Sequence, residues 1–206
     1  MRRRLTVALS AFVATCAFSG CSLFSSAKPV EVRWFSPESL ASTGPQPPAE
    51  PGTRRLALGR VTSSALLRNH IVFRRSSVEL GTYDDLEWTD YPETYVRHAL
   101  LRALYETNRF VEASGPGVPT LDVDVIGFEE VRHGPARGGC VQLAYELRDG
   151  DTILSSGVVT AERPGAAGTE IDQVVRAIAG ALDDATTRLA ASAHDALSAL
   201  VGHGTR

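Results

Sequence analysis

Side chains suited to a core recur at three- and four-residue intervals between residues 92 and 107, opposite a charged face. The inward positions are Val96, Ala99, Leu100, Ala103, Leu104 and Thr107. This spacing predicts an amphipathic helix. Asp90 and Glu93 have the spacing of a capping box, and Pro92 is tolerated in a first helical turn, so we expect the helix to open at Asp90. The neighbouring strands are the expected partner, because a helix gains most of its stability by burying its apolar stripe.

Alternation of apolar and polar residues predicts strands in the second half of the chain. Residues 121–125 and 141–147 both alternate in this way, which is typical of a strand with one buried and one wet face. Asp149 and Gly150 then supply the turn of a tight hairpin before residues 153–159, because glycine accepts a positive φ. Residues 134–139 lie between two strands and are interpreted as a hairpin loop.

Shorter extended runs precede the first helix. Residues 30–35, 55–61 and 71–73 are interpreted as strands, and residues 77–80 are a further candidate. The segment that follows, which holds Tyr83 and Trp88, is interpreted as turn-rich. Five prolines between residues 36 and 54 exclude regular structure there, so this segment is predicted to be a stiff loop or tether.

A second long helix is predicted near the C-terminus. Thr169 and Asp172 form a capping-box pattern, and the apolar positions that follow share one face. These positions are Ile171, Val174, Val175, Ile178, Leu182, Ala185 and Leu189, and an alanine-rich continuation reaches Leu200. The order of elements predicts an α/β (α+β) fold, in which two long helices pack on a mixed β-sheet within a single compact domain. We place this domain at residues 30–200, with 36–54 as its Pro-rich loop and 201–206 as a tail.

The N-terminus has the three regions of a secretory signal. Arg2, Arg3 and Arg4 precede an apolar stretch at 5–18, which is short for a membrane-spanning helix of ~20 residues. Phe18-Ser19-Gly20-Cys21 then resembles the lipobox of bacterial lipoproteins, which implies acylation of Cys21 and removal of residues 1–20 as a signal peptide. Residues 21–29 would form a tether, and Ser22 resembles the sorting pattern for the outer membrane. A retained anchor helix and conventional cleavage near Ala17 are the alternatives.

Composition, charge and cysteine content mainly exclude some partners and covalent links. The chain has 206 residues, of which 43% are hydrophobic and 22% charged, and this suits one folded domain with appendages. A net charge of -3 and a pI near 6.0 argue against a nucleic-acid partner, which would require clustered Lys and Arg. With Cys16 inside the signal and Cys21 acylated, only Cys140 remains, so no intramolecular disulfide is expected. A buried thiol is the favoured role for Cys140.

No residue pattern supports catalysis or a cofactor. The five histidines include no i, i+3 or i, i+4 pair that would place two ligands on one metal. Asp84, Asp85 and Glu87 could be imagined as acid–base carboxylates, but acidic turns before helices are common for capping reasons. Residues 134–139 lack the Lys-Ser/Thr of a phosphate loop, and no Gly-x-Ser-x-Gly elbow occurs. We therefore expect a protein that is not an enzyme.

Tyr83 and Trp88 have two interpretations. They could form an exposed contact surface for a partner, because large aromatic residues supply much of the binding energy at interfaces. The alternative is a core role, since a Trp between the start of a helix and a sheet is usually buried.

One stretch of the chain carries a family resemblance. Leu67-Arg68-Asn69-His70-Ile71-Val72-Phe73-Arg74, followed by Tyr83, Leu86, Trp88 and Pro92, resembles the ABC-type transport auxiliary lipoproteins, the PqiC or YmbA-like family. The lipobox at Cys21 and the order of elements fit this family over most of the mature length. Two departures are Val32-Arg33-Trp34-Phe35, where the family has a Tyr-x-Leu strand, and a looser spacing from Trp to Pro.

The resemblance implies an outer-membrane lipoprotein that faces the periplasm and has no turnover of its own. It would be an accessory or docking component for an MCE-domain protein and an ABC transporter permease/ATPase complex, which move (phospho)lipid between the inner and outer membranes. A homo-oligomer is left open. A lipoprotein that scaffolds or activates cell-wall machinery is the competing class, and a periplasmic enzyme is the third.

Overall fold

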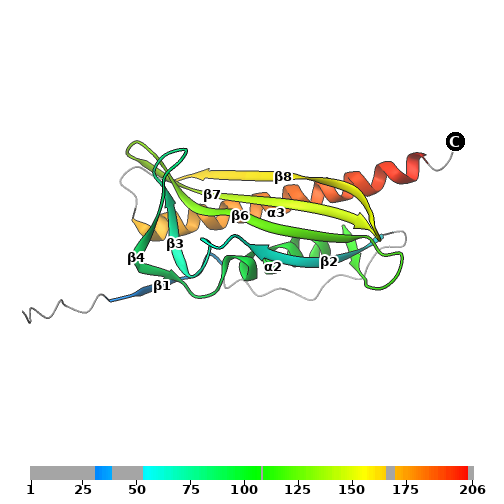
Figure 1. The fold of residues 1–206 in the computed structure, drawn as a ribbon, viewed down its shortest axis with the longest axis horizontal. Helices are drawn as coiled ribbons and strands as arrows, with labels where there is room; N and C mark the ends of the chain where they lie inside the picture. Colours follow the sequence, from blue (N-terminus) through cyan, green and yellow to red (C-terminus); the bar gives the residue numbers. More distant parts are fainter. Residues whose placement is uncertain (1–30, 39–52, 108, 166–169, 204–206) are drawn as a thin grey trace, which may run out of the picture. The chain divides into compact units, whose positions relative to one another are not determined.

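The computed structural model describes residues 31–38, 53–107, 109–165 and 170–203. In these ranges the chain has the predicted α+β architecture, an eight-stranded mixed sheet with two long helices (Figure 1). The strands are β1 (Arg33–Phe35), β2 (Arg54–Ser63), β3 (His70–Arg74), β4 (Leu80–Trp88), β5 (Phe110–Glu112), β6 (Thr120–His133), β7 (Ala136–Asp149) and β8 (Thr152–Pro164). The helices are α2 (Pro92–Leu101), continued by the π-helix η1 (Arg102–Glu106), and α3 (Ile171–His203).

Four sequence interpretations fall outside the described residues. They are the signal peptide 1–20, the tether 21–29, most of the Pro-rich loop (39–52) and the capping residue Thr169. These remain predictions.

The sheet is organised around β6, which pairs with different strands along its two edges. One edge pairs along its whole length with antiparallel β7, and β7 pairs in turn with β8. The other edge is shared between two parallel strands, with β2 beside residues 120–125 and β3 beside residues 129–131. A register shift between Val125 and Gly127 marks this division. The sheet then continues to β5 beyond β2, and to β4 and β1 beyond β3.

Both helices pack on one face of this sheet. α3 runs along β7 and β8 and also contacts α2, which in turn packs on β2 and β6 (Figure 1). Every apolar position predicted for the second helix is buried, so its amphipathic pattern is confirmed. Trp88, Tyr95 and Phe128 form an aromatic centre of the core, with the Trp88 and Phe128 ring centroids 5.4 Å apart.

Gly139 allows α3 to approach β7 closely. A Cβ atom at this position would lie 2.2 Å from the backbone nitrogen of Ile178 and 2.4 Å from the carbonyl carbon of Ala177. No side chain fits there, because the obstructing atoms belong to the helix backbone. The glycines next to Cys140 therefore have a packing role in addition to any role in a turn.

Both predicted hairpins are present. β6 and β7 are joined at Gly134, although the strand begins again at Ala136 and so takes in much of the expected loop. β7 and β8 are joined through Gly150, which has φ 56° as a tight hairpin requires. α3 continues to His203, so the residues assigned to a tail from 201 onward are helical up to that point.

Other boundaries differ from the predictions. The segment holding Tyr83 and Trp88 is the nine-residue strand β4 rather than a run of turns, and only Leu80 of the candidate strand 77–80 is extended. The first strand is shorter than predicted, covering Arg33–Phe35. The strands predicted around 55–61, 71–73, 121–125, 141–147 and 153–159 are all present.

The first helix does not open with a capping box at Asp90. Its N-cap is Tyr91, and no side chain caps it. Pro92 excludes helical backbone at the preceding residue, so Tyr91 is extended (φ -74°, ψ 146°) and Asp90 lies one residue too early. The Asp90 carboxylate accepts hydrogen bonds from the Tyr91 N–H and the Thr94 hydroxyl, while Glu93 accepts one from Ser63.

Candidate functional site

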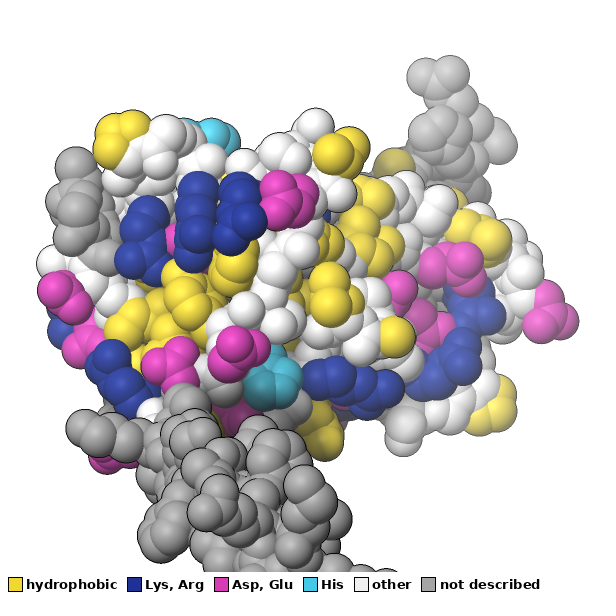
Figure 2. Space-filling model, turned by 60° about the vertical axis from the view of Figure 1, so that its left-hand side comes forward, with side chains coloured by type: hydrophobic (Ala, Val, Ile, Leu, Met, Phe, Trp, Pro, Cys, Tyr) yellow, Lys and Arg dark blue, Asp and Glu magenta, His cyan; other side chains and the backbone are white. Residues whose placement is uncertain are grey.

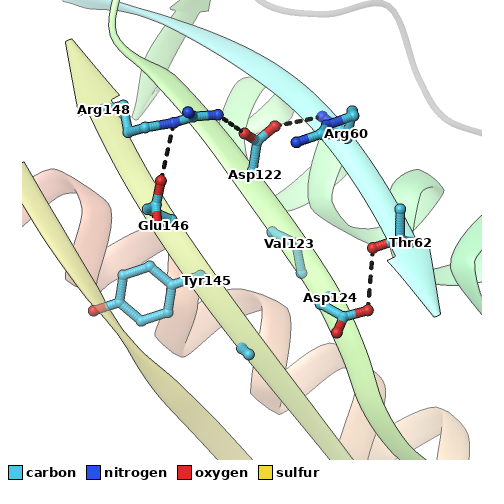
Figure 3. Close-up of a pocket in the computed structure, with 9 residues that line it drawn as sticks. Arg60, Thr62, Asp122, Val123, Asp124, Tyr145, Glu146 and Arg148 are labelled. Carbon is cyan, nitrogen blue, oxygen red and sulfur yellow. Dashed lines mark hydrogen bonds and ion pairs between the residues drawn. The ribbon is translucent and has the colours of Figure 1, made fainter. Parts of the chain in front are cut away.

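The face of the sheet opposite the helices is polar where β2, β6 and β7 meet. Asp122 and Asp124 alternate along β6 with Leu121, Val123 and Val125, which point into the core. A hollow of about 400 Å³ lies at this place (Figure 3). Its lining residues are Arg60, Thr62, Asp122, Val123, Asp124, Ala144, Tyr145, Glu146 and Arg148.

Charged groups around this hollow are paired with one another. The Arg148 guanidinium bridges Asp122 and Glu146, with 3.1 Å between Arg148 Nε and Glu146 Oε1 (Figure 3). Asp122 also accepts a hydrogen bond from the backbone N–H of Arg60 at 2.7 Å, and Asp124 accepts one from the Thr62 hydroxyl at 3.1 Å. These contacts tie three strands together, and they suit a structural or docking face better than a proton-transfer site.

A second cluster surrounds Tyr83 at the other end of β6. We call Tyr83, Glu130, Arg132 and Arg137 the arginine–tyrosine cluster. The Tyr83 hydroxyl donates to Glu130 Oε2 at 2.6 Å and accepts from Arg132 Nη2 at 2.7 Å and Arg137 Nη2 at 2.6 Å. Both guanidinium groups also donate to the Glu130 carboxylate through Nε at 2.7 Å. Glu130 is fully buried, whereas the Arg132 and Arg137 side chains are 28% and 25% exposed.

The electrostatics of the cluster favour an ionised Glu130. Burial by itself raises the pKa of this carboxyl, but hydrogen bonds from Arg137, Arg132 and Tyr83 outweigh burial and lower the pKa below its ordinary value. Burial and the neighbouring Glu130 raise the pKa of Tyr83, so its hydroxyl keeps its proton. The carboxylate therefore holds the two guanidinium groups in fixed positions at the surface.

Aromatic rings support the arginines of this cluster. Arg132 lies 4.0 Å from the centroid of Phe73, and Arg75 lies 5.4 Å from the same ring. Phe73 in turn meets Tyr83 edge to face, with 5.0 Å between centroids. Figure 2 shows a row of basic side chains beside a hydrophobic patch on the side of the molecule that carries β3 and β4. Guanidinium groups over aromatic rings are common at binding surfaces.

The structure separates the two aromatic residues singled out from the sequence. Tyr83 is half-buried and belongs to the arginine–tyrosine cluster. Trp88 is only 1% exposed and packs on Tyr95 and Phe128, so it is a core residue and does not fit a partner contact. Its indole N–H finds no acceptor within the described ranges.

Residues with catalytic or ligand chemistry are scattered. Glu87 accepts a hydrogen bond from Asn69 at 2.9 Å, and Asp84 and Asp85 lie on β4 rather than in a turn. Burial, followed by nearby Glu129 and Glu162, raises the pKa of the Cys140 thiol to about 11, as expected of a buried cysteine. Among the residues that the structure describes, no three His, Cys, Asp or Glu side chains gather as a metal site would require. None of the helices in this part of the chain has the length and hydropathy of a membrane span.

Sequence reasoning missed most of the arginine–tyrosine cluster. Glu130 lies two residues beyond the core residue Phe128 on β6, and this spacing places a charge on the inward face of a strand. A buried charge requires a partner of opposite charge, so an acidic residue at an inward position was the signal in the sequence that could have indicated this cluster. Its partners Arg132 and Arg137 are brought to it by the hairpin of β6 and β7.

The fold has relatives among solved structures. No protein-family model and no curated protein sequence match the chain. A crystal structure of a Xanthomonas campestris protein of the DUF330 family matches with a TM-score of 0.64 and 19% identity, over 75% of this chain and 94% of that one. A crystal structure described as an uncharacterized protein matches at 0.60 and 18%, over 79% and 98%. A hypothetical protein from Chlamydia trachomatis matches at 0.51 and 6%, over 72% and 99%. At these identities the likeness establishes that the chain shares their fold.

Proposed function

We propose that this protein is an outer-membrane lipoprotein that serves as a non-catalytic docking component of an MCE-type ABC lipid transport system. The fold carries the proposal. A DUF330 structure covers 75% of the chain, and DUF330 is the PqiC or YmbA-like family that the sequence resembles. Acylation of Cys21 would fix the chain to the membrane, and the folded domain would act through its surface.

The arginine–tyrosine cluster is the surface we assign to the partner. Arginine and aromatic residues are enriched at interfaces and dominate their energetics. Buried Glu130 holds Arg132 and Arg137 in place, so little side-chain entropy remains to be lost on binding. Around the cluster, Arg75, Arg132 and Arg137 are paired with Glu79 and Glu130, which leaves an excess of one positive charge. This surface suits an acidic segment of the partner.

The length of the tether restricts where docking takes place. Glu31 is ten positions beyond Cys21, so the chain between them spans at most about 35 Å even when fully extended. The domain therefore stays close to the outer membrane. Its partner must supply the length needed to cross the periplasm, as the MCE-domain protein of the resembling family does while held by its permease and ATPase.

Co-elution tests the proposal. The mature chain and the periplasmic part of the MCE-domain protein encoded beside it are mixed at tens of micromolar and run on a size-exclusion column. We expect a complex. Arg75, whose side chain is 58% exposed, lies at the rim of the cluster, and Arg75→Glu should weaken binding by about tenfold, or about 1.4 kcal/mol.

Arg176→Glu is the matched control, since it makes the same charge change on the exposed side of α3. If the Arg75 and Arg176 variants bound the MCE-domain protein equally well, the cluster would not be part of the interface, although the MCE-domain protein would still be the partner. No co-elution with the MCE-domain protein, together with capture of a cell-wall synthase, would favour the scaffold function instead.

A further inference from the structure

Two aromatic side chains lie exposed where the folded domain begins. Trp34 on β1 is 57% exposed, and Tyr91, directly before α2, is 47% exposed. Both line one hollow of about 240 Å³, together with Asn69, Thr89 and Asp90, and its floor includes Trp88. Exposed aromatic residues that share one surface indicate a site of contact.

The exposure of Trp34 follows from its place in the sheet. Within the described ranges, β1 lies at the edge of the sheet and pairs with β4 alone, in a register that sets Trp34 beside Glu87. Its neighbour Phe35 packs against the core, and Arg33 lies over the Phe35 ring at 5.0 Å. Alternation along the strand therefore sends Trp34 to the opposite side. A Trp in this position has an apolar body with a polar N–H, which is the combination found at membrane–water interfaces.

Polar groups beside the two rings are engaged with the protein. Asp90 accepts hydrogen bonds from the Tyr91 N–H at 2.8 Å and from the Thr94 hydroxyl at 3.1 Å, and the Asn69 amide donates to Glu87 at 2.9 Å. The two carboxylates give this surface a mild negative character. A zwitterionic lipid surface fits it better than a strongly anionic one, because anionic headgroups would repel Asp90 and Glu87.

We propose that Trp34 and Tyr91 insert between the headgroups of a zwitterionic bilayer and thereby set the orientation of the domain on the membrane. Trp34 is thirteen positions beyond Cys21, so its backbone lies within about 45 Å of the anchor in any conformation. A tether this short keeps even a weakly binding patch at high local concentration near the lipid. The inference rests on the proposed acylation of Cys21.

Tryptophan fluorescence tests this directly, because the chain has two Trp residues, Trp34 and the buried Trp88. The acylated full chain is placed in phosphatidylethanolamine–phosphatidylcholine vesicles with or without brominated acyl chains, which quench Trp on contact. We expect brominated lipid to reduce wild-type emission by roughly a third, and to leave Trp34→Phe, which retains Trp88, almost unchanged. Tyr91→Ala should reduce the quenching, whereas Val158→Ser, at a 59% exposed position on β8, should not.

Two results would overturn the inference. One is equal emission in plain and brominated vesicles while the protein still floats with them. The other is shielding of Trp34 from acrylamide without quenching by bromine, which would mean that a second copy or another protein covers the patch.

Flotation with vesicles reports whether the chain is acylated, independently of the quenching of Trp34. A chain that does not float with vesicles lacks the anchor, and this contradicts the proposed function. In that case the chain starting at residue 21 is coupled to a maleimide lipid through Cys21, which is selective because Cys140 is buried. The same quenching measurement then decides the role of Trp34 without depending on acylation.

Discussion

Gly139→Ala is predicted to destabilise the domain by about 3 kcal/mol, the upper end of the range for overpacked cores. The added Cβ would lie 2.2 Å from Ile178 N, 2.4 Å from Ala177 C and 2.5 Å from Ile178 Cα. All three are backbone atoms of α3, so no rotamer change relieves the clash. The helix must move away from β7 by about 1 Å to reach ordinary contact, and this opens the packing around fully buried Ile178.

Gly180→Ala is the matched control, because it adds the same methyl group two residues along the same helix from Ile178. Its Cβ would lie 3.4 Å from the Arg163 side chain, an ordinary contact. Alanine favours helix over glycine by about 1 kcal/mol, so this variant should be more stable than wild type. The opposite signs separate the local geometry of Gly139 from any general effect of replacing glycine.

Urea denaturation followed by circular dichroism and Trp fluorescence gives the free energy of unfolding for all three proteins. In a thermal scan, a loss of 3 kcal/mol corresponds to a decrease in Tm of about 6–12 °C for a domain of this size. A Gly139→Ala protein within about 0.5 kcal/mol of wild type would falsify the close-approach argument. So would equal destabilisation by both variants, since the two sites would then not differ in available space.

Three further predictions concern single side chains. The folded-state pKa of Glu130 is lowered, so its stabilisation is present above the unfolded pKa of about 4.3 and is lost as pH falls through the folded pKa. Glu130→Gln should therefore cost about 2–3 kcal/mol at pH 7 and show a shallower decline in stability from about pH 5 to 3 than wild type, and parallel declines would contradict this. Cys140, with a pKa of about 11, should react with a thiol reagent at pH 8 only after unfolding, whereas rapid native-state labelling would show that it is accessible. Cys21→Ser should leave the precursor unprocessed and free of labelled palmitate; label on the variant would exclude the lipobox.

The helices and the long hairpins were predictable because their patterns are uninterrupted. From Ile171 to Leu189 every inward position except Thr186 is apolar, so one period describes the whole segment, and the burial of α3 follows it. β6 and β7 alternate cleanly where each has one buried and one open face. Gly150 added a local signal for the turn, since its positive φ is needed whatever the rest of the chain does.

β4 was missed because its alternation is broken. Its pairing with β3 changes from Val72–Thr82 to His70–Glu87, so three extra residues of β4 fall between these two pairs. Tyr83, Asp84, Asp85 and Leu86 lie in this irregular part, and they resemble a turn when only local sequence is considered. The helix boundary was misplaced by a comparable local conflict, in which the restriction that Pro92 imposes on Tyr91 outweighs the capping preference of Asp90.

The arginine–tyrosine cluster depends on contacts between residues far apart in the sequence. Tyr83 and Glu130 are 47 positions apart in the sequence. They come close in space because β4 and β6 lie on either side of the same strand, β3, and their side chains meet across it. To predict such a cluster, one must know the order of the strands in the sheet, and hydrophobic periodicity does not give that order. The exposure of Trp34 has the same origin, since the residue lies on an edge strand whose position depends on its pairing with β4.

β4 also links the proposed membrane contact to the proposed docking surface. Trp34 lies beside Glu87, and Tyr83 is four residues from Glu87 on the same strand, at most about 13 Å away at the usual rise per residue and less where β4 is irregular. If Trp34 lies among the headgroups, the arginine–tyrosine cluster must lie near the bilayer surface. Its distance from Trp34 is limited to about two strand spacings across the sheet plus the distance along β4 between Tyr83 and Glu87. A partner that binds the cluster must then approach the outer membrane closely. Loss of Trp34 would leave the cluster intact but free its orientation, so Trp34→Phe should preserve binding in solution and weaken it on vesicles, whereas Arg75→Glu should weaken both.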